Sequence, residues 1–186
     1  MLAWGIVRDY KGVDVLLQAA ATVPDVEVTV AGELWGEAGE RVRAAAADPR
    51  LAGRVELREG FVPGEQLPAL LADADVLALT YRHATASQNV TLAHVHGLPV
   101  LATRVGTFAD QVRDGVDGLL VAPDDVAAVA GALRRLAEPG VLEGLRAGVP
   151  EVDLEGPWHA YLQTLTALAD PAALAGPAAQ GGAGRG

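Results

Sequence analysis

The sequence predicts an α/β fold: a Rossmann-like, doubly wound parallel sheet of about six strands with helices on both faces. Three observations support this prediction. Short apolar runs alternate with helical patterns from the N-terminus to about residue 150, which is typical of parallel α/β sheets. Most of the runs are apolar on both faces, as strands covered on two sides are. Glycines punctuate the turns between them, where a backbone with positive φ or a close approach is needed.

The elements follow one another in a regular order. Strands are predicted at residues 2–7, 26–31, 54–58, 76–81, 99–103 and 118–121. Helices are predicted between and after them, at residues 13–21, 37–46, 64–72, 88–96, 108–113 and 125–136. The pattern breaks at Glu138-Pro-Gly140, and a short helix is expected at residues 141–147. These elements make one domain, residues 1–150.

The C-terminal part of the chain divides into two further segments. Residues 151–170 are expected to hold a separate terminal helix, because Tyr161, Leu162, Leu165 and Leu168 share one apolar face at helical spacing. Residues 171–186 are nearly all Ala, Gly and Pro. Such a composition predicts a disordered tail.

Composition excludes several function classes. The 186 residues are 51% hydrophobic, which is enough apolar surface for a sizeable core. The net charge of −10 argues against general binding of nucleic acid, because no basic stripe is present to replace counterions on a phosphate backbone. Cysteine is absent, so a cytoplasmic location is the default expectation. No apolar run approaches the roughly 20 residues of a membrane span, so no membrane-spanning helix is expected.

Lys11 is the only lysine in a chain with thirteen arginines. It lies in the turn between the first predicted strand and helix, three residues after Arg8. A lysine at such a turn can place a compact positive charge on a diphosphate. Alternatively, codon bias has replaced the other lysines by arginine and Lys11 survives by accident. On this segment alone the two interpretations stand equal.

A second candidate site follows the fourth predicted strand, where Tyr81 begins a loop of small polar residues that enters a helix. Ligands of α/β sheets bind at such strand ends. Thr85 or Ser87 can cap the helix, so that the amides of Gln88 and Asn89 would point outward with the positive end of the helix dipole. The loop is then a candidate anion site. An ordinary capped helix that binds nothing is the alternative, and the loop alone favours it.

The histidines near this loop do not form a metal site. His94 and His96 are two residues apart on a predicted helix and so point about 200° apart, and no acidic residue lies between Asp75 and Asp110 to complete a metal shell. His83 lies in the strand-end loop, where it could donate a hydrogen bond to a sugar hydroxyl. An exposed loop histidine without a ligand is the alternative interpretation.

Gly32 ends the second predicted strand and could let the backbone approach a ligand next to Glu33. The segment is not a GxGxxG fingerprint, and no such motif follows the first strand, which argues against a dinucleotide-dependent dehydrogenase. The chain also has no GxxxxGK[ST] segment for a P-loop and no GxSxG nucleophile elbow.

Taken together and in order, several segments resemble a known family. They are Gly5-Ile-Val-Arg-Asp-Tyr-Lys-Gly12, Val30-Ala-Gly-Glu33, Ala74-Asp-Val76, Tyr81-Arg82 with Ala84-Thr85 and Ser87, His96-Gly-Leu-Pro-Val-Leu-Ala-Thr103, Val105-Gly106, Asp114-Gly115 and Asp117-Gly-Leu-Leu-Val-Ala-Pro123. Over residues 1 to about 165 the chain is similar to the C-terminal half of GT-B glycosyltransferases of group 1, family four type. Trp158 and Tyr161 match the terminal helix of that half, which crosses back towards the other domain.

The resemblance implies a nucleotide-sugar donor domain of a retaining hexosyltransferase, with a nucleotide-diphosphate sugar as substrate and no further cofactor or metal. It implies that Arg8 and Lys11 are the catalytic cations at the donor diphosphate, where fixed charges and helix-end amides would stabilise the leaving group. The remaining donor contacts are expected from Gly32, Glu33, Tyr81, His83, Thr85, Ser87, Gln88 and Asn89.

Two departures from the family pattern change the expectation. Ala84 and Leu92 stand where the family commonly has two glutamates. Some relatives carry a similar Tyr-Arg-x-Ala-Thr-x-Ser loop. Where the family often has a further glutamate after a Gly-Gly turn, this chain has Thr107 and Asp110. The resemblance also covers no acceptor-binding half. We therefore expect the chain to be inactive alone, with an N-terminal acceptor domain as partner or with self-association. A non-catalytic nucleotide-sugar-binding or interaction module is the alternative; a sugar-nucleotide epimerase ranks below both.

Overall fold

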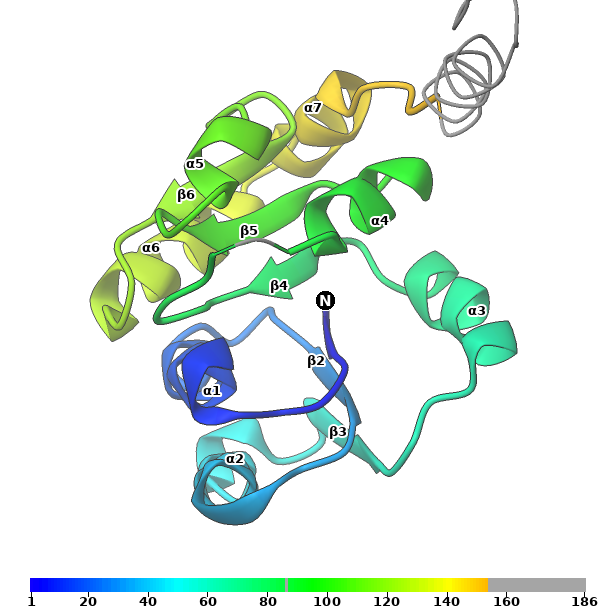
Figure 1. Cartoon of the computed structure of the whole chain (residues 1–186). Coiled ribbons are helices and arrows are strands. Elements are labelled where there is room, and N and C mark those ends of the chain that lie inside the picture. The colour runs from blue at the N-terminus through cyan, green and yellow to red at the C-terminus, as the bar shows by residue number, and fades with distance from the viewer. Residues whose placement is uncertain (86, 154–186) are drawn as a thin grey trace, which may run out of the picture. The chain divides into compact units, whose positions relative to one another are not determined.

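A computed structural model describes residues 1–85 and 87–153 (Figure 1). Its sheet has six strands, all parallel, in the order β3-β2-β1-β4-β5-β6. The strands are β1 (Leu2–Trp4), β2 (Val28–Gly32), β3 (Val55–Glu59), β4 (Leu77–Leu79), β5 (Val100–Thr103) and β6 (Gly118–Val121). The predicted fold class is confirmed.

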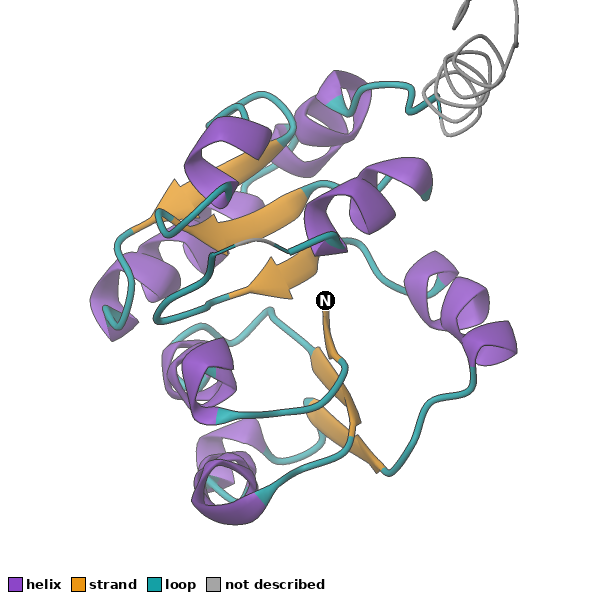
Figure 2. Cartoon of the chain, viewed as in Figure 1, coloured by secondary structure: helices purple, strands orange, loops and turns teal. Residues whose placement is uncertain are grey.

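Helices cover both faces of this sheet, and Figure 2 shows them on either side of the strands. One buried cluster joins the strands to α1 (Val13–Ala20), α2 (Gly36–Ala46), α6 (Val126–Leu136) and α7 (Val141–Gly148). The other joins them to α3 (Leu67–Ala72), α4 (Asn89–Val95) and α5 (Phe108–Gln111). Adjacent strand residues contribute to opposite clusters, as Leu2 and Ala3 do, because successive side chains of a strand point to opposite faces.

Several predicted boundaries were wrong by a few residues. The first strand ends at Trp4 and not at residue 7, because Gly5 turns the chain with a φ of 93°. Val7 then returns to form an isolated bridge with Leu34. The fourth strand ends at Leu79 and not at residue 81, and beyond it the Tyr81 carbonyl accepts a hydrogen bond from the Thr103 hydroxyl (2.6 Å).

The helices need smaller corrections. The predicted helix at residues 64–72 is a 3₁₀ turn, η3 (Gly64–Gln66), followed by α3. Two other 3₁₀ turns, η1 (Asp9–Lys11) and η2 (Pro49–Leu51), lie in connections that were not predicted to be helical. The short helix after Gly140 is confirmed as α7. Residues Met1–Glu151 form one compact unit; the predicted terminal helix around residues 158–168 and the tail at 171–186 lie outside the described residues.

One strand differs from the others in its surroundings. β3 is an edge strand that pairs only with β2 in the sheet, and Glu56, Arg58 and Glu59 on it are exposed. Arg58 pairs with Glu56 on the same strand, and Arg43 of α2 pairs with Glu59. Charged residues on an edge discourage pairing with another chain, which explains why this strand is not a continuous apolar run.

The strand order creates one special position. The chain runs from β1 outward to β2 and β3, then crosses to β4 on the other side of β1. The turn after β1 and the loop after β4 therefore flank the point where the order reverses. Ligands of doubly wound sheets bind outside the carboxyl ends of the strands at this point, and the fold brings the Lys11 turn and the loop that begins at Tyr81 together there.

Candidate functional site

Lys11 points inward at the carboxyl end of β1. Its Nζ donates a hydrogen bond to the Trp4 carbonyl (2.9 Å), and the residue is only 8% exposed. Burial lowers the pKa of Lys11 to about 8, because a low-dielectric surrounding disfavours the charged form. Within the described residues Lys11 forms no ion pair with a carboxylate. The buried ammonium thus has one neutral hydrogen-bond acceptor, and its Nζ also lies over the Tyr81 ring, 5.8 Å from the ring centroid.

The turn that carries Lys11 is clamped onto the end of β4. The Arg82 amide donates to the Tyr10 carbonyl (2.7 Å), and the Thr80 hydroxyl donates to the Gly12 carbonyl (3.0 Å). Gly12 has a φ of 58°, and a Cβ at this position would lie 2.1 Å from the Thr80 carbonyl oxygen. Only glycine allows the two backbones to approach this closely.

Charged side chains reinforce the clamp. The Arg82 guanidinium pairs with Asp14 of α1 and with Asp124, and it also donates to the Asp9 carbonyl (2.7 Å). Arg41 of α2 pairs with Asp9 and Asp14. Burial alone would raise the pKa of Asp14, but the hydrogen bonds and charge of Arg82 outweigh burial and hold that pKa below its usual value.

A hollow of about 430 Å³ opens beside Lys11, and we call it the Lys11 hollow. The Asn89 side-chain amide donates a hydrogen bond to the Tyr81 hydroxyl there (2.8 Å), and burial raises the pKa of Tyr81. Tyr10 packs edge-on against Tyr81, with ring centroids 5.5 Å apart. The fold thus brings six of the predicted residues together. The lining consists of Tyr10, Lys11, Tyr81, His83, Ala84, Thr85, Ser87 and Asn89.

A second hollow of about 570 Å³ adjoins the first, and we call it the Arg8 hollow. Tyr10 and His83 line both hollows. The Arg8 guanidinium lies over the ring of Trp35, 4.9 Å from its centroid. Tyr10 and Trp35 were not predicted as site residues. The signal that could have indicated Trp35 is a large aromatic residue three positions after the end of β2.

Three predicted contacts are placed differently from what was expected. Gly32 was expected to admit a ligand. A Cβ there would meet the Gly5 carbonyl oxygen at 2.2 Å, so this glycine lets the ends of β1 and β2 approach, and its contact with a ligand stays a prediction. Glu33 accepts a hydrogen bond from the Trp35 indole (2.6 Å). Gln88 is exposed and lines neither hollow.

The expected anion site at the start of α4 is not formed as predicted. Neither Thr85 nor Ser87 occupies the capping position, which is Gln88. The Ser87 hydroxyl accepts a hydrogen bond from the Asn89 backbone amide (3.3 Å), so this amide already has a partner within the loop. The helix is also only seven residues long.

The histidines lie as their spacing predicts. His94 is buried and His96 is exposed, so the two rings do not converge. The Nε2 atom of His94 is buried and finds no hydrogen-bond partner in the described part of the chain, and burial lowers the pKa of this residue. In residues 1–85 and 87–153, no group of three or more His, Asp or Glu side chains is arranged to hold a metal ion.

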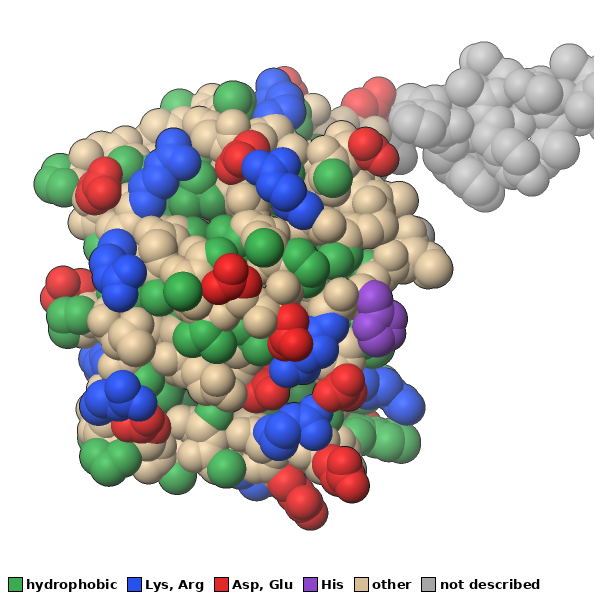
Figure 3. All heavy atoms as spheres, turned by 90° about the vertical axis from the view of Figure 1, so that its left-hand side faces the viewer, with side chains coloured by type: hydrophobic (Ala, Val, Ile, Leu, Met, Phe, Trp, Pro, Cys, Tyr) green, Lys and Arg blue, Asp and Glu red, His purple; other side chains and the backbone are tan. Residues whose placement is uncertain are grey.

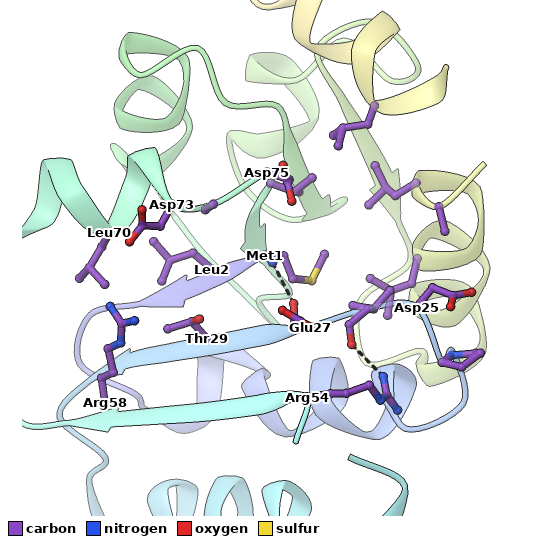
Figure 4. A pocket seen from close by; sticks show the side chains of 18 residues that line it. Met1, Leu2, Asp25, Glu27, Thr29, Arg54, Arg58, Leu70, Asp73 and Asp75 are labelled. Atoms are coloured by element: carbon purple, nitrogen blue, oxygen red, sulfur yellow. Dashed lines mark hydrogen bonds between the residues drawn. The ribbon is translucent and has the colours of Figure 1, made fainter. Parts of the chain in front are cut away.

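A further hollow, of about 620 Å³, lies at the opposite end of the sheet (Figure 4). Its lining includes residues at the amino ends of strands, such as Leu2 and Asp75. The Met1 amino group donates there to the Glu27 carbonyl (2.8 Å). Because parallel sheets bind their ligands at the carboxyl ends of the strands, this hollow is separate from the candidate site.

The surface charges are mixed. On the face shown in Figure 3, basic and acidic side chains lie next to one another, and no field of one sign covers it. Eight arginines of the described part of the chain take part in ion pairs. No helix of the described residues is long and apolar enough to cross a membrane.

Comparison with known proteins agrees with this geometry. Residues 1–139 match the family described as "Glycosyl transferases group 1". The chain is 32% identical over 148 residues to 2-deoxystreptamine glucosyltransferase of Streptomyces kanamyceticus, a match covering 77% of this chain and 38% of that protein. It is 34% identical over 122 residues to D-inositol 3-phosphate glycosyltransferase of Mycolicibacterium gilvum, covering 63% and 27%. The chain thus spans about a third of the length of these relatives.

Two solved structures share the fold. Anabaena HepE, solved in complex with UDP, superposes with a TM-score of 0.75 at 22% identity over 89% of this chain and 48% of that chain. The C-terminal domain of a group 1 family protein, LpcC of Francisella tularensis, superposes with a TM-score of 0.66 at 19% identity. That match covers 79% of this chain and 80% of the domain, so the described fold is that of a C-terminal half-domain.

Proposed function

This chain belongs to the group 1 glycosyltransferase family, and from that premise we propose that it is the donor-binding half of a retaining glycosyltransferase. In this proposal residues 1–150 bind a nucleotide-diphosphate sugar whose sugar is transferred to an acceptor. The curated relatives are named as glycosyltransferases, and HepE has been solved with UDP and with UDP-glucose. These names support the proposed class of donor.

The observation that carries the proposal is the buried ammonium of Lys11, which has no carboxylate partner within the described residues. A buried charge without a counter-charge costs free energy, and the lowered pKa of Lys11 reflects that cost. A diphosphate in the Lys11 hollow would supply the missing negative charge. The position of this hollow, at the point where the strand order reverses, is where doubly wound sheets bind nucleotides.

Arg8 and Lys11 have a direct role in the proposed reaction. When the bond between the anomeric carbon and the diphosphate oxygen breaks, its electron pair stays on the diphosphate, whose negative charge grows. Fixed cations aimed at this charge stabilise the transition state more than the ground state. Lys11 supplies a point charge, and Arg8 supplies a planar group that can donate two parallel hydrogen bonds.

We further propose that this chain binds the donor without transferring sugar by itself. Transfer requires an acceptor held in line with the reacting carbon, and such orientation contributes up to about 7–11 kcal/mol of barrier lowering. The described unit forms only one side of the site, at the carboxyl edge of its sheet. A second candidate function is a non-catalytic nucleotide-sugar-binding module. The observation that favours it is Ala84, which lines the Lys11 hollow where the family commonly has a glutamate.

Binding is tested by thermal unfolding of the chain with UDP, GDP and ADP. A ligand at about 100 times its dissociation constant adds about 2.7 kcal/mol to the free energy of unfolding. We expect one nucleotide to do so in the wild type, and we expect Lys11→Met to reduce this effect strongly. Arg50→Ala, an exposed arginine in η2 outside both hollows, is the matched control. An equal response of Lys11→Met and the wild type would show that the phosphate assignment is wrong.

Turnover separates the two candidate functions. Donor sugars are supplied with and without a separately produced N-terminal acceptor domain of a family member, and sugar transfer and donor hydrolysis are measured. Transfer that appears only with the added domain supports the donor-binding half of an enzyme. Nucleotide binding with no transfer or hydrolysis in any pairing supports the binding module instead.

A further inference from the structure

We propose that Trp35 is a positioning residue for Arg8: its indole, oriented by Glu33, holds the Arg8 guanidinium at the Arg8 hollow so that Arg8 and Lys11 engage the same diphosphate. This inference rests on the proposed function, because it concerns how the donor diphosphate is bound. It assigns a role to an exposed aromatic side chain that burial in the core does not explain, since Trp35 is 51% exposed.

The backbone brings these residues together. Beyond the regular part of the sheet, the Val7 amide donates to the Glu33 carbonyl (2.8 Å), and the Trp35 amide donates to the Val7 carbonyl (3.3 Å). This parallel bridge extends the pairing of β1 and β2 past Gly5 and Gly32. Arg8 and Trp35 therefore follow neighbouring backbone positions on the same edge of the sheet.

Glu33 fixes the plane of the ring. Its Oε2 accepts a hydrogen bond from the Trp35 Nε1 (2.6 Å), and a carboxylate acceptor makes such a bond stronger than a neutral one. Asp9, the acidic residue next to Arg8 in the sequence, pairs instead with Arg41 and Arg82. Arg8 is thereby left with the ring face and not with a carboxylate: within the described residues it forms no ion pair, whereas Arg41 and Arg82 are both paired.

Stacking leaves the chemistry of Arg8 available. A guanidinium over an aromatic ring uses its flat face, and its N–H donors stay directed outward in their plane. The Arg8 and Lys11 hollows share Tyr10 and His83, whose rings lie 5.8 Å apart. A diphosphate has two phosphoryl groups, so one ligand can reach both cations from these adjoining hollows.

The test is a double-mutant cycle on nucleotide affinity. Wild type, Trp35→Leu, Arg8→Ala and the double variant are titrated by calorimetry with the diphosphate that binds best among UDP, GDP and ADP, and with its parent nucleoside. An exposed cation–π contact corresponds to roughly two- to five-fold in affinity. We expect Trp35→Leu to weaken diphosphate binding by about this factor in the wild-type background and to have no effect in the Arg8→Ala background.

Two further variants separate positioning from packing. Trp35→Phe keeps an aromatic face and should recover most of the affinity, whereas Glu33→Ala removes the acceptor of the indole N–H and should weaken diphosphate binding less than Trp35→Leu does. The affinity for the parent nucleoside should stay unchanged in Trp35→Leu, Trp35→Phe and Glu33→Ala. A role of Trp35 in folding alone would instead change nucleoside and diphosphate affinity together.

The possible failures are distinguishable. If Arg8→Ala weakens diphosphate binding but Trp35→Leu does not, or if the two losses add fully in the double variant, the inference about Trp35 is overturned and the donor-binding proposal stands. If the wild type binds no nucleotide diphosphate, the donor-binding proposal itself is overturned, and the inference falls with it.

Discussion

Arg82 holds Asp14 by two parallel hydrogen bonds, Nη1 to Oδ1 at 3.0 Å and Nη2 to Oδ2 at 2.9 Å, across 68 positions of sequence. Asp14 lies in the first turn of α1, and Arg82 follows the end of β4. This pair therefore joins the segment that carries Lys11 to the loop that forms the other side of the Lys11 hollow.

Asp14→Asn should destabilise the chain by about 2–3 kcal/mol, because it leaves the Arg82 and Arg41 charges without their buried partner. Urea unfolding measures the change. The matched control is Glu56→Gln, which breaks an exposed pair on β3 and should cost less than about 1 kcal/mol. Because the pKa of Asp14 is lowered in the fold, the stability from this pair is present above the unfolded pKa and is lost as pH falls through the folded value. Equal costs for the two variants would contradict a structural role for the clamp.

Gly12→Ala should destabilise the chain by at least about 3 kcal/mol, because the new Cβ must displace the Thr80 backbone in addition to adopting a left-handed conformation. Gly97→Ala is the matched control: its φ of 67° is similar, but nothing lies within 4 Å of its added Cβ. That variant should cost about 1–2 kcal/mol for the backbone conformation alone. Thermal or urea unfolding of both variants checks the difference, and a similar loss in each would argue against the close approach.

Nucleotide affinity should fall as pH rises through about 8, where Lys11 loses its proton in the free chain. The protonated form is the one that attracts a diphosphate, so the sign follows directly. With this pKa, affinity at pH 9 should be about ten-fold lower than at pH 7. Calorimetric titrations across this range provide the measurement. Lys11→Met should bind weakly with a flat profile, and a wild-type profile that is equally flat would remove Lys11 from the site.

His94 should make the fold sensitive to acid. Burial lowers its pKa in the folded chain, so below about pH 6.5 the unfolded chain takes up a proton that the folded chain resists. Stability should then fall as pH drops below the unfolded value of about 6.5, because the unfolded state binds more protons there. His94→Leu should flatten that slope in urea unfolding, whereas His96→Gln, at an exposed position, should not. The same slope in wild type and His94→Leu would assign the acid sensitivity to other groups.

The sequence predicted the fold well because its signals are local. Apolar runs of strand length, helical spacing between them, and glycines at turns such as Gly97 and Gly106 depend on neighbours a few positions away. The same signals located the turn of Lys11 and the loop that begins at Tyr81. The fold then brought Lys11, Tyr81, His83, Thr85, Ser87 and Asn89 to one hollow.

Residue type and spacing did not indicate where particular backbone groups point. The amide of Asn89 was expected to face an anion, and the Ser87 hydroxyl accepts its hydrogen bond instead. Gly32 was expected to admit a ligand; a Cβ there would meet the Gly5 carbonyl oxygen, and the expected ligand contact stays a prediction. Both outcomes depend on contacts between backbone and side-chain atoms in loops, which residue type and spacing do not specify.

The amino-acid sequence alone determined the α/β class, the approximate elements and the position of a lone lysine at a strand-to-helix turn. Tertiary structure decided that β4 lies beside β1. Only this neighbourhood lets Arg82 reach Asp14 and lets the Gly12 backbone approach the Thr80 backbone closely. It also decided that the Arg8 guanidinium lies over the Trp35 ring. The physical reason is that periodicity records which face of each element is buried, whereas a site made by contacts between elements depends on strand order and on the close approach of their backbones.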